Sequence, residues 1–460
     1  MTGPGSPHRS LLVRSAEHVW CGDAAGTELA GVSILCVDGR IDRIGVPAED
    51  WPKADREVDA SGCLVVPGLI NTHHHLYQTL TRAFSPALGC DLFGWLKVLY
   101  PVWSRLDEES AYVSARVGLA ELLLSGCTTS SDHLYVHPRG HADLIAAEIR
   151  AARETGIRFH ATRGSMSLSE KDGGLPPDDV VEDEDQILAD SERLVAAFHD
   201  PEPGAMVRVG LAPCSPFSVT PDLMRRSAEL ARRLGVRLHT HLAETKSELD
   251  YCRERFGETP YELAGRLDWL GPDVWFAHAV WTSQLEIGML ARTGTGITHC
   301  PTSNMILGSG MCPVTDLLAE GVPVGLGCDG SASNDASDLW QEVRQAMLLA
   351  HLRSGADAFS SRDALRLATN GSAACLGRDD IGSIEPGKRA DLACYPLDGL
   401  SMAGAALDPV EGVVRTGVRR AAHTIVDGHV AVEDGRLTAD HSAAIARHRA
   451  IAREWAEATS

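Results

Sequence analysis

The chain has 460 residues, 44% of them hydrophobic and 23% charged, which are ordinary values for a large soluble globular enzyme. Its formal net charge of −21 argues against nucleic acid or an anionic membrane as a partner, because both bind basic surfaces. Residues 1–10 contain no signal-peptide core, no apolar run reaches membrane-spanning length, and the 12 cysteines include no CxxC pair, so we expect a cytoplasmic protein.

The two ends of the chain share a sequence pattern that is typical of short β-strands. Residues 10–66 alternate short apolar runs with turn signals, and Asp38-Gly39 between two such runs predicts a hairpin. The same pattern returns after residue 390, where Asp427-Gly428 is a second hairpin candidate. We predict one small β-sandwich domain built from residues 1–66 and 380–437, followed by a C-terminal helix over residues 438–460.

The middle of the chain, residues 67–379, alternates strands with helices. Asp107 and Asp338 are candidate N-caps of two helices, and Gly126 is a candidate end of the first. Eight strands are expected, namely Leu64-Val-Val leading to His75, residues 128–133, 157–163, 206–211 and 296–299, and the runs that end at His241, His278 and Asp329. Eight such alternations predict an α/β fold of the (β/α)8 TIM-type barrel class.

Four of these strand ends carry candidate metal ligands or proton carriers. The carboxyl ends of the strands of a parallel barrel meet at one mouth. His73 and His75 lie two apart, so on an extended strand they point to the same face, and His241 and Asp329 would join them. Three imidazoles and a carboxylate predict a site for one divalent metal with room for a water; Zn²⁺ suits it best, and Fe²⁺ accepts the same ligands.

Other residues at the same mouth suit proton transfer. Glu244 follows His241 by three residues, where a carboxylate can shuttle protons without binding the metal. His278 could polarise the substrate or bind the metal loosely, and Asp329 could also accept a proton from the water. A bridged metal pair would need a lysine at the end of the fourth strand, and none lies near Cys214. His299 could either contact the substrate or form hydrogen bonds to residues of the site. His133, His137 and His239 are expected mainly in structural roles.

The complete motif set resembles the mononuclear aminohydrolase branch of the amidohydrolase superfamily over essentially the whole chain. The residues that carry the resemblance are His73-x-His75, His241-x-x-Glu244, His278, His299-Cys-Pro-Thr-Ser-Asn304 and Asp329-Gly-Ser-Ala-Ser-Asn334. That branch deaminates purines, adenosine-type nucleosides and triazines. The resemblance implies hydrolytic deamination by an activated water, with Glu244, His278 and Asp329 as the catalytic residues.

A finer resemblance bears on the substrate. Segments 71–82, 95–103, 162–174 and 211–217 are similar to deaminases that act on 8-oxoguanine, which would yield urate and ammonia. Trp103 stands where nucleoside deaminases carry a ribose-binding glutamate, and Cys214 where they carry a histidine. The resemblance therefore implies a flat, free N-heterocyclic base as the small-molecule substrate. The implied ring contacts are Gln78, Trp103, Arg163, Cys214, His278 and Ser331.

Three alternatives remain at this point. The nearest is a triazine or pteridine (isoxanthopterin-like) aminohydrolase or chlorohydrolase; Glu244 favours deamination, because loss of ammonia needs a proton donor and loss of chloride does not. A cyclic-amide hydrolase is disfavoured by the missing lysine. A metal-binding scaffold without activity would be expected to lack a ligand or the shuttle, and none is missing. We also expect a homo-oligomer.

Overall fold

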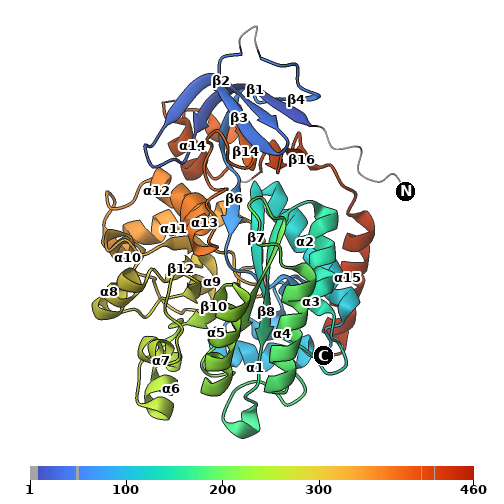
Figure 1. Cartoon of the computed structure of the whole chain (residues 1–460), viewed down its shortest axis with the longest axis vertical. Helices are drawn as coiled ribbons and strands as arrows, with labels where there is room; N and C mark the ends of the chain where they lie inside the picture. The colour runs from blue at the N-terminus through green and yellow to red at the C-terminus, as the bar shows by residue number, and fades with distance from the viewer. Residues whose placement is uncertain (1–8, 48–50, 406, 419, 460) are drawn as a thin grey trace.

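A closed barrel of parallel strands forms the centre of the molecule (Figure 1). The computed structural model describes residues 9–47, 51–405, 407–418 and 420–459. The first eight residues, which belong to the stretch where we expected no signal peptide, lie outside the described residues. The barrel strands follow one another in chain order: β6 (Leu69–Asn71), β7 (Cys127–Leu134), β8 (Arg158–Ser165), β9 (Val207–Pro213), β10 (Leu238–Leu242), β11 (Val274–His278), β12 (Gly296–His299) and β13 (Val324–Leu326). The predicted barrel is confirmed.

The first barrel strand begins later than the sequence suggested. The run Leu64-Val-Val, expected to lead into the barrel, lies in β5 (Cys63–Pro67), which pairs antiparallel with β14 of the terminal sheet. Pro67 has no N–H to continue a strand, and a Cβ at Gly68 would collide with Thr128, so the chain changes partners here. The barrel strand itself is the three-residue β6.

Both ends of the chain build one separate nine-stranded sheet. Its turn residues Asp38, Gly39, Asp427 and Gly428 all have positive φ, between +48° and +78°, as the predicted two-residue hairpins require. Apolar side chains from both ends share one buried cluster, which includes Val13 and Leu392. The strands are β1 (Ser10–Trp20), β2 (Glu28–Val37), β3 (Arg40–Gly45), β4 (Arg56–Asp59), β5, β14 (Leu392–Pro396), β15 (His423–Val426), β16 (His429–Glu433) and β17 (Arg436–Leu437).

Helices surround the barrel and cover its strands. Asp107 caps α2 in a reciprocal capping box with Ser110, an arrangement that stabilises a helix by about 1 kcal/mol, and Asp338 caps α11, both as predicted. No helix in the described ranges is long and apolar enough to cross a membrane. The helices are α1 (Leu92–Trp103), α2 (Glu108–Leu124), α3 (Leu144–Thr155), α4 (Glu184–Phe198), α5 (Pro221–Leu234), α6 (Lys246–Phe256), α7 (Pro260–Arg266), α8 (Gln284–Thr293), α9 (Pro301–Ile306), α10 (Val314–Ala319), α11 (Leu339–Ser354), α12 (Ser361–Arg366), α13 (Ser372–Cys375), α14 (Pro409–Thr416) and the expected C-terminal α15 (Ser442–Glu457).

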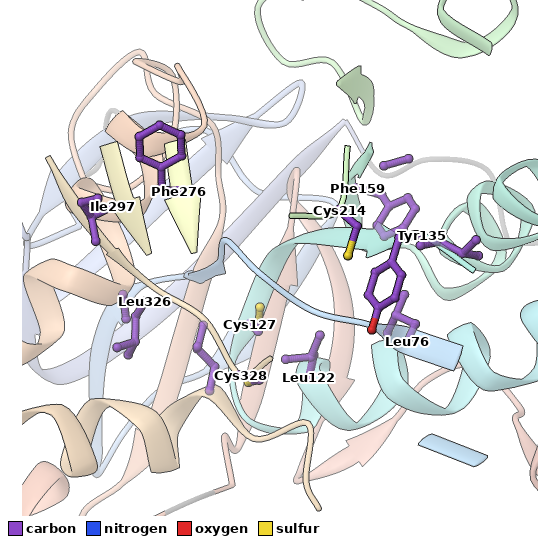
Figure 2. Close-up of a cluster of buried hydrophobic side chains, with 14 of the residues drawn as sticks. Leu76, Leu122, Cys127, Tyr135, Phe159, Cys214, Phe276, Ile297, Leu326 and Cys328 are labelled. Carbon is purple, nitrogen blue, oxygen red and sulfur yellow. The ribbon is translucent and has the colours of Figure 1, made fainter. Parts of the chain in front are cut away.

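Apolar packing holds the helices against the strands. Figure 2 shows part of this cluster, in which Phe159, Phe276 and Ile297 from the barrel belong to the same buried core as Leu122 of α2. Each of these side chains is essentially inaccessible to solvent. Burying one such side chain contributes about 1.5–3 kcal/mol, so the rim of the barrel is a rigid platform for the side chains that follow its strands.

The terminal sheet is fixed to the amino end of the barrel by a buried ion pair. Arg158 at the start of β8 donates to both carboxylate oxygens of Asp391, each at 3.1 Å, and to Asp427 Oδ1 at 3.2 Å. Although burial opposes the charge of Arg158, these two carboxylates raise its pKa. Because the sheet occupies this end, the opposite rim is left for the residues at the carboxyl ends of the strands (Figure 1).

Candidate active site

The predicted metal ligands come together at the carboxyl rim of the barrel. His73 Nε2 lies 3.4 Å from Asp329 Oδ1, and His75 Nε2 lies 3.2 Å from the same oxygen. His75 Nε2 and His241 Nε2 are 3.1 Å apart. All four side chains are at most 9% exposed. Three segments far apart in the sequence therefore place three imidazoles and one carboxylate around a single point.

Hydrogen bonds to main-chain carbonyls set the tautomers of two of these histidines. His75 Nδ1 lies 2.6 Å from the carbonyl oxygen of His133, and His241 Nδ1 lies 2.7 Å from that of Cys214. A carbonyl oxygen only accepts, so each Nδ1 carries the proton and each Nε2 presents a lone pair. Two lone pairs facing each other at 3.1 Å repel unless a cation lies between them.

The third histidine is set by a relay through His239. His239 Nδ1 donates to the carbonyl oxygen of Trp275 at 2.8 Å, which leaves His239 Nε2 as an acceptor for His73 Nδ1, also at 2.8 Å. His73 Nε2 therefore carries a lone pair as well, and it has no hydrogen-bond partner among the described residues. The possible ligand atoms of His73, His75, His133 and His241 all lie within 4.8 Å of one another, as do those of His73, His278 and Asp329. These two groups share His73 and contain all four predicted ligands, so the residues fit one divalent metal.

The electrostatics agree with a cation at this point. Burial holds the pKa of His73 and of His241 well below the usual value, so both rings are neutral ligands. Although burial alone would raise the pKa of Asp329, the neighbouring rings of His73 and His75 hold it well below its usual range. An anionic carboxylate beside neutral imidazoles is the donor set that a divalent metal requires.

Glu244 and His278 lie beside Asp329 at the same mouth of the barrel. His278 Nε2 is 3.7 Å from Glu244 Oε2 and 3.9 Å from Asp329 Oδ2. Burial, together with the charges of Asp329 and Glu248, raises the pKa of Glu244 well above its usual value, which favours the protonated acid. Burial lowers the pKa of His278 to about 4, so this ring is neutral.

The backbone at these strand ends adopts unusual conformations. Ala243, His278, Ala279 and Asp329 all have positive φ, between +48° and +76°, a region that costs residues other than glycine of order 1–3 kcal/mol. Glu248 holds one of these turns, because its carboxylate accepts from the N–H groups of Ala243 and Glu244 at 2.8 and 2.9 Å. The turns aim the side chains of His278 and Asp329 into the mouth instead of along the strands.

A cavity opens beside the ligands, and three of the six predicted ring contacts line it: Gln78, Cys214 and His278. Its empty volume is ≈ 390 Å³, including the open mouth. Aromatic and apolar walls with a few polar groups suit a flat heterocycle. The other lining residues are His75, Leu92, Trp95, Leu96, Tyr100, Tyr135, Phe217, His241, Glu244, Leu307, Asp329 and Ser333. Figure 2 shows two of the lining residues, Tyr135 and Cys214.

The other three predicted contacts lie outside this lining. Trp103 is fully buried and donates to Thr81 Oγ1 at 3.1 Å, packed behind Trp95 and Tyr100. Arg163 is held by Glu182 and Asp190 at 2.7 and 2.9 Å. Ser331 Oγ lies 3.1 Å from Ser337 Oγ, and Ser333 lines the cavity in its place. The aromatic wall expected of Trp103 is made by Trp95, Tyr100, Tyr135 and Phe217.

The histidines expected in structural roles include two that touch the metal ligands. His239 orients His73, and the spacing His239-x-His241 already placed both on one face of β10. His133 offers its carbonyl to His75, and its ring stacks on that of His241 with centroids 4.8 Å apart. His299 is buried and does not line the cavity. Nothing in the sequence pointed to Ser309, which donates to Glu244 Oε1 at 3.2 Å.

We expect one tightly bound divalent metal per chain, because the lone pairs of the histidines converge on a single point. In addition, no lysine that could bridge a second ion lines the cavity. Elemental analysis of the purified, active enzyme measures this directly. Two ions per active chain would contradict the mononuclear reading, and chelation that removes one ion should abolish turnover.

Proteins similar to this chain across nearly their whole length are deaminases and related hydrolases. The 8-oxoguanine deaminase of Pseudomonas aeruginosa is 51% identical over 431 residues, which cover 93% of this chain and 96% of that protein. The hydroxydechloroatrazine ethylaminohydrolase of a Pseudomonas species is 40% identical over 90% of this chain and 89% of its own. An isoxanthopterin deaminase from an unknown prokaryotic organism is 38% identical over 89% of each chain.

The solved structures and the family model agree with these relatives. The zinc complex of atrazine chlorohydrolase from Arthrobacter aurescens superimposes with a TM-score of 0.92 at 35% identity, covering 96% of this chain and 100% of that one. The model of the amidohydrolase family matches residues 64–431, which include every predicted ligand and the whole barrel. With the barrel, the convergent ligands and this match in place, the chain belongs to the amidohydrolase family.

Proposed function

We propose that this enzyme deaminates 8-oxoguanine by hydrolysis, giving urate and ammonia, with one Zn²⁺ per chain. The chain is a hydrolase of C–N bonds, and its relatives act on purine, pterin and triazine rings. Among them the 8-oxoguanine deaminase shares 51% of its residues over nearly its full length. The zinc complex of the similar chlorohydrolase supports zinc as the metal.

The observation that carries the proposal is the position of the Glu244 carboxyl group, which is buried at the edge of the cavity beside His278. Its Oε1 accepts from Ser309 Oγ at 3.2 Å, and its Oε2 faces His278 Nε2 at 3.7 Å. An amino group leaves a ring carbon only after it gains a proton, whereas chloride leaves unprotonated. A buried acid at this place therefore favours deamination over dechlorination.

When bound, the metal supplies an activated water. Asp329 would take the proton of that water at Oδ2, the oxygen that accepts from Ser303 Oγ at 2.6 Å. Glu244 would deliver its proton to the ring nitrogen beside the attacked carbon, then take up the proton of the new hydroxyl group and pass it to the amino group. The C–N bond would then break, ammonia would leave as the C=O bond forms, and the proton held by Asp329 would restore the acid. Asn304 Nδ2 lies 3.0 Å from His278 Nδ1 and donates to it, so His278 Nε2–H would stabilise the oxygen of the tetrahedral carbon.

The edge of the substrate would be recognised by hydrogen bonds that guanine cannot make. 8-Oxoguanine presents N7–H and a C8 carbonyl, whereas guanine has a bare N7 acceptor. Gln78 lines the cavity, and its Oε1 has no hydrogen-bond partner among the described residues, so it offers an acceptor for a ring N–H. A site that leaves such a group unpaired with the wrong ligand loses about 1–3 kcal/mol of binding.

We therefore expect 8-oxoguanine to be preferred over guanine by about 10–100-fold in kcat/KM, and over nucleosides by more, since aromatic walls close the cavity. Ammonia release from a panel of purines, pteridines and triazines tests this. Equal efficiency on guanine and 8-oxoguanine would refute the discrimination argument.

The second candidate is an aminohydrolase of pterins or triazines. The relatives at 38–40% identity, whose names refer to isoxanthopterin and an atrazine derivative, favour it. The same water attack and the same acid would serve either ring. In the same panel, turnover of isoxanthopterin or a triazine without turnover of 8-oxoguanine would assign the enzyme to this candidate.

We further propose that the enzyme works as a homo-oligomer in the cytoplasm. Several large apolar side chains are exposed on its helices, including Leu285 and Leu352 at 85% and 74% exposure. The cysteines of the chain are free thiols, and most are buried, which suits a reducing compartment. Light scattering on the purified enzyme measures the oligomeric state.

A further inference from the structure

A second cavity lies at the opposite end of the barrel from the proposed catalytic site. It is lined by residues at or near the amino ends of neighbouring strands, among them His160 of β8, Arg208 of β9, Arg237 just before β10 and Trp275 of β11. Its empty volume is ≈ 450 Å³, including the space open to solvent. The deamination proposed above uses none of these residues.

Two arginines in this lining have no carboxylate partner among the described residues. Arg208 donates to the carbonyl oxygens of Pro201, Glu202 and Gly377 at 3.2–3.4 Å, and its buried Nε has no partner. Arg237 donates to the carbonyl oxygen of Cys375 at 2.7 Å, and its buried Nε is likewise unpaired. Each guanidinium thus retains a full charge and at least one N–H without an acceptor.

The carboxylates nearest to this cavity already serve other cations. Asp380 is paired with Arg378 at 2.7 Å, Asp391 is paired with Arg158, and Asp427 is shared by Arg158 and Arg389. Asp200 and Asp273 lie close enough to act on Arg208 and Arg237 but form no ion pair with them. The cavity therefore has an excess of positive charge, although the chain carries −21 overall.

His160 adds a neutral donor to the same lining. Arg378 Nη1 lies 3.3 Å from His160 Nε2, and a guanidinium only donates, so Nε2 accepts and Nδ1 carries the proton. No acceptor for this N–H is found in the described part of the chain. Burial and the surrounding arginines lower the pKa of His160 well below its usual value, so the ring stays neutral.

We propose that this cavity is a binding site for a small oxyanion of the phosphate class, held by Arg208, Arg237 and His160. Guanidinium groups bind such oxygens through short, charge-assisted hydrogen bonds. An anion here would neutralise the surplus charge of the two guanidinium groups. The buried Arg158 has a carboxylate partner, Asp391, and Arg208 and Arg237 have no such partner among the described residues. The site is independent of the proposed deamination.

The test is a titration of the zinc-loaded full-length enzyme with inorganic phosphate, at ionic strength held constant with NaCl. We expect a saturable rise in Tm of about 2–8 °C and a saturable heat in calorimetry. Arg208→Gln and Arg237→Gln should each lose most of this rise, while Arg237→Lys should keep part of it. Arg253→Gln, which changes an exposed arginine of α6, should retain the full effect. Ribose 5-phosphate in a parallel titration distinguishes free phosphate from a phosphate group on a larger molecule.

Two results would overturn the proposal. One is a rise in Tm no larger than that given by NaCl alone. The other is a rise that persists in both glutamine variants, since phosphate would then bind elsewhere, for example at the metal. Deaminase activity without phosphate shows that each variant is folded. Because Arg208 is partly exposed, its variant carries the test even if Arg237→Gln does not fold.

Discussion

Glu244→Gln is expected to keep its metal and to lower kcat by about 10²–10⁴-fold. Glutamine preserves the size and polarity of the side chain and can still accept from Ser309 Oγ. It cannot release a proton to the ring nitrogen or to the leaving amine. Because Glu244 belongs to neither group of possible metal ligands, metal content measured by elemental analysis should stay at one ion per chain.

Two further variants sharpen this test. Glu254→Gln changes an exposed glutamate of α6 and should retain full turnover. Ser309→Ala removes only the hydrogen bond that orients the acid, so we expect a smaller loss than for Glu244→Gln. Near-normal kcat in the Glu244 variant would place the proton shuttle on another residue.

The second large effect is expected from the ligands themselves. His73→Ala and His241→Ala each remove one of four donors, so metal and activity should be lost together, with turnover down by about 10³-fold or more. His239→Ala leaves all four donors but frees the ring of His73, and we expect it to weaken metal binding by about 10–100-fold.

The predicted order is a larger loss for the two ligand variants than for His239→Ala. It can be tested by measuring metal content, competition with a chelator and kcat on the same preparations. His429→Ala, which changes an exposed histidine of β16, is the matched control and should behave as the unaltered enzyme. A His241→Ala enzyme that holds its metal as tightly as the parent would remove His241 from the ligand set.

The residues that end strands could be predicted because their position follows from the chain alone. A polar side chain directly after an apolar, β-branched run must emerge at the carboxyl rim of a parallel barrel, as His241, His278 and Asp329 do. The hairpins at Asp38-Gly39 and Asp427-Gly428 could also be predicted from local sequence, since only a few residue types tolerate positive φ at both turn positions.

The cavity wall could not be predicted in the same way, because it depends on how distant elements pack. Trp95 and Trp103 both lie on α1, and only the docking of that helix decides that Trp95 lines the cavity while Trp103 packs behind it. The run Leu64-Val-Val was assigned to the barrel because a buried strand of the terminal sheet has the same apolar pattern. Its true partner, β14, is more than 300 residues away in the sequence.

That pairing has a consequence for synthesis in the cell. β5 leaves the ribosome long before β14, and at about 5–20 residues per second the delay is roughly 15–65 s. During this interval the N-terminal strands have an open hydrogen-bonding edge, while all eight barrel strands emerge. The nascent chain thus depends on its C-terminal strands to pair with its N-terminal strands. A ribosome stalled before residue 392 would leave an unpaired, aggregation-prone strand edge, which we expect chaperones to bind.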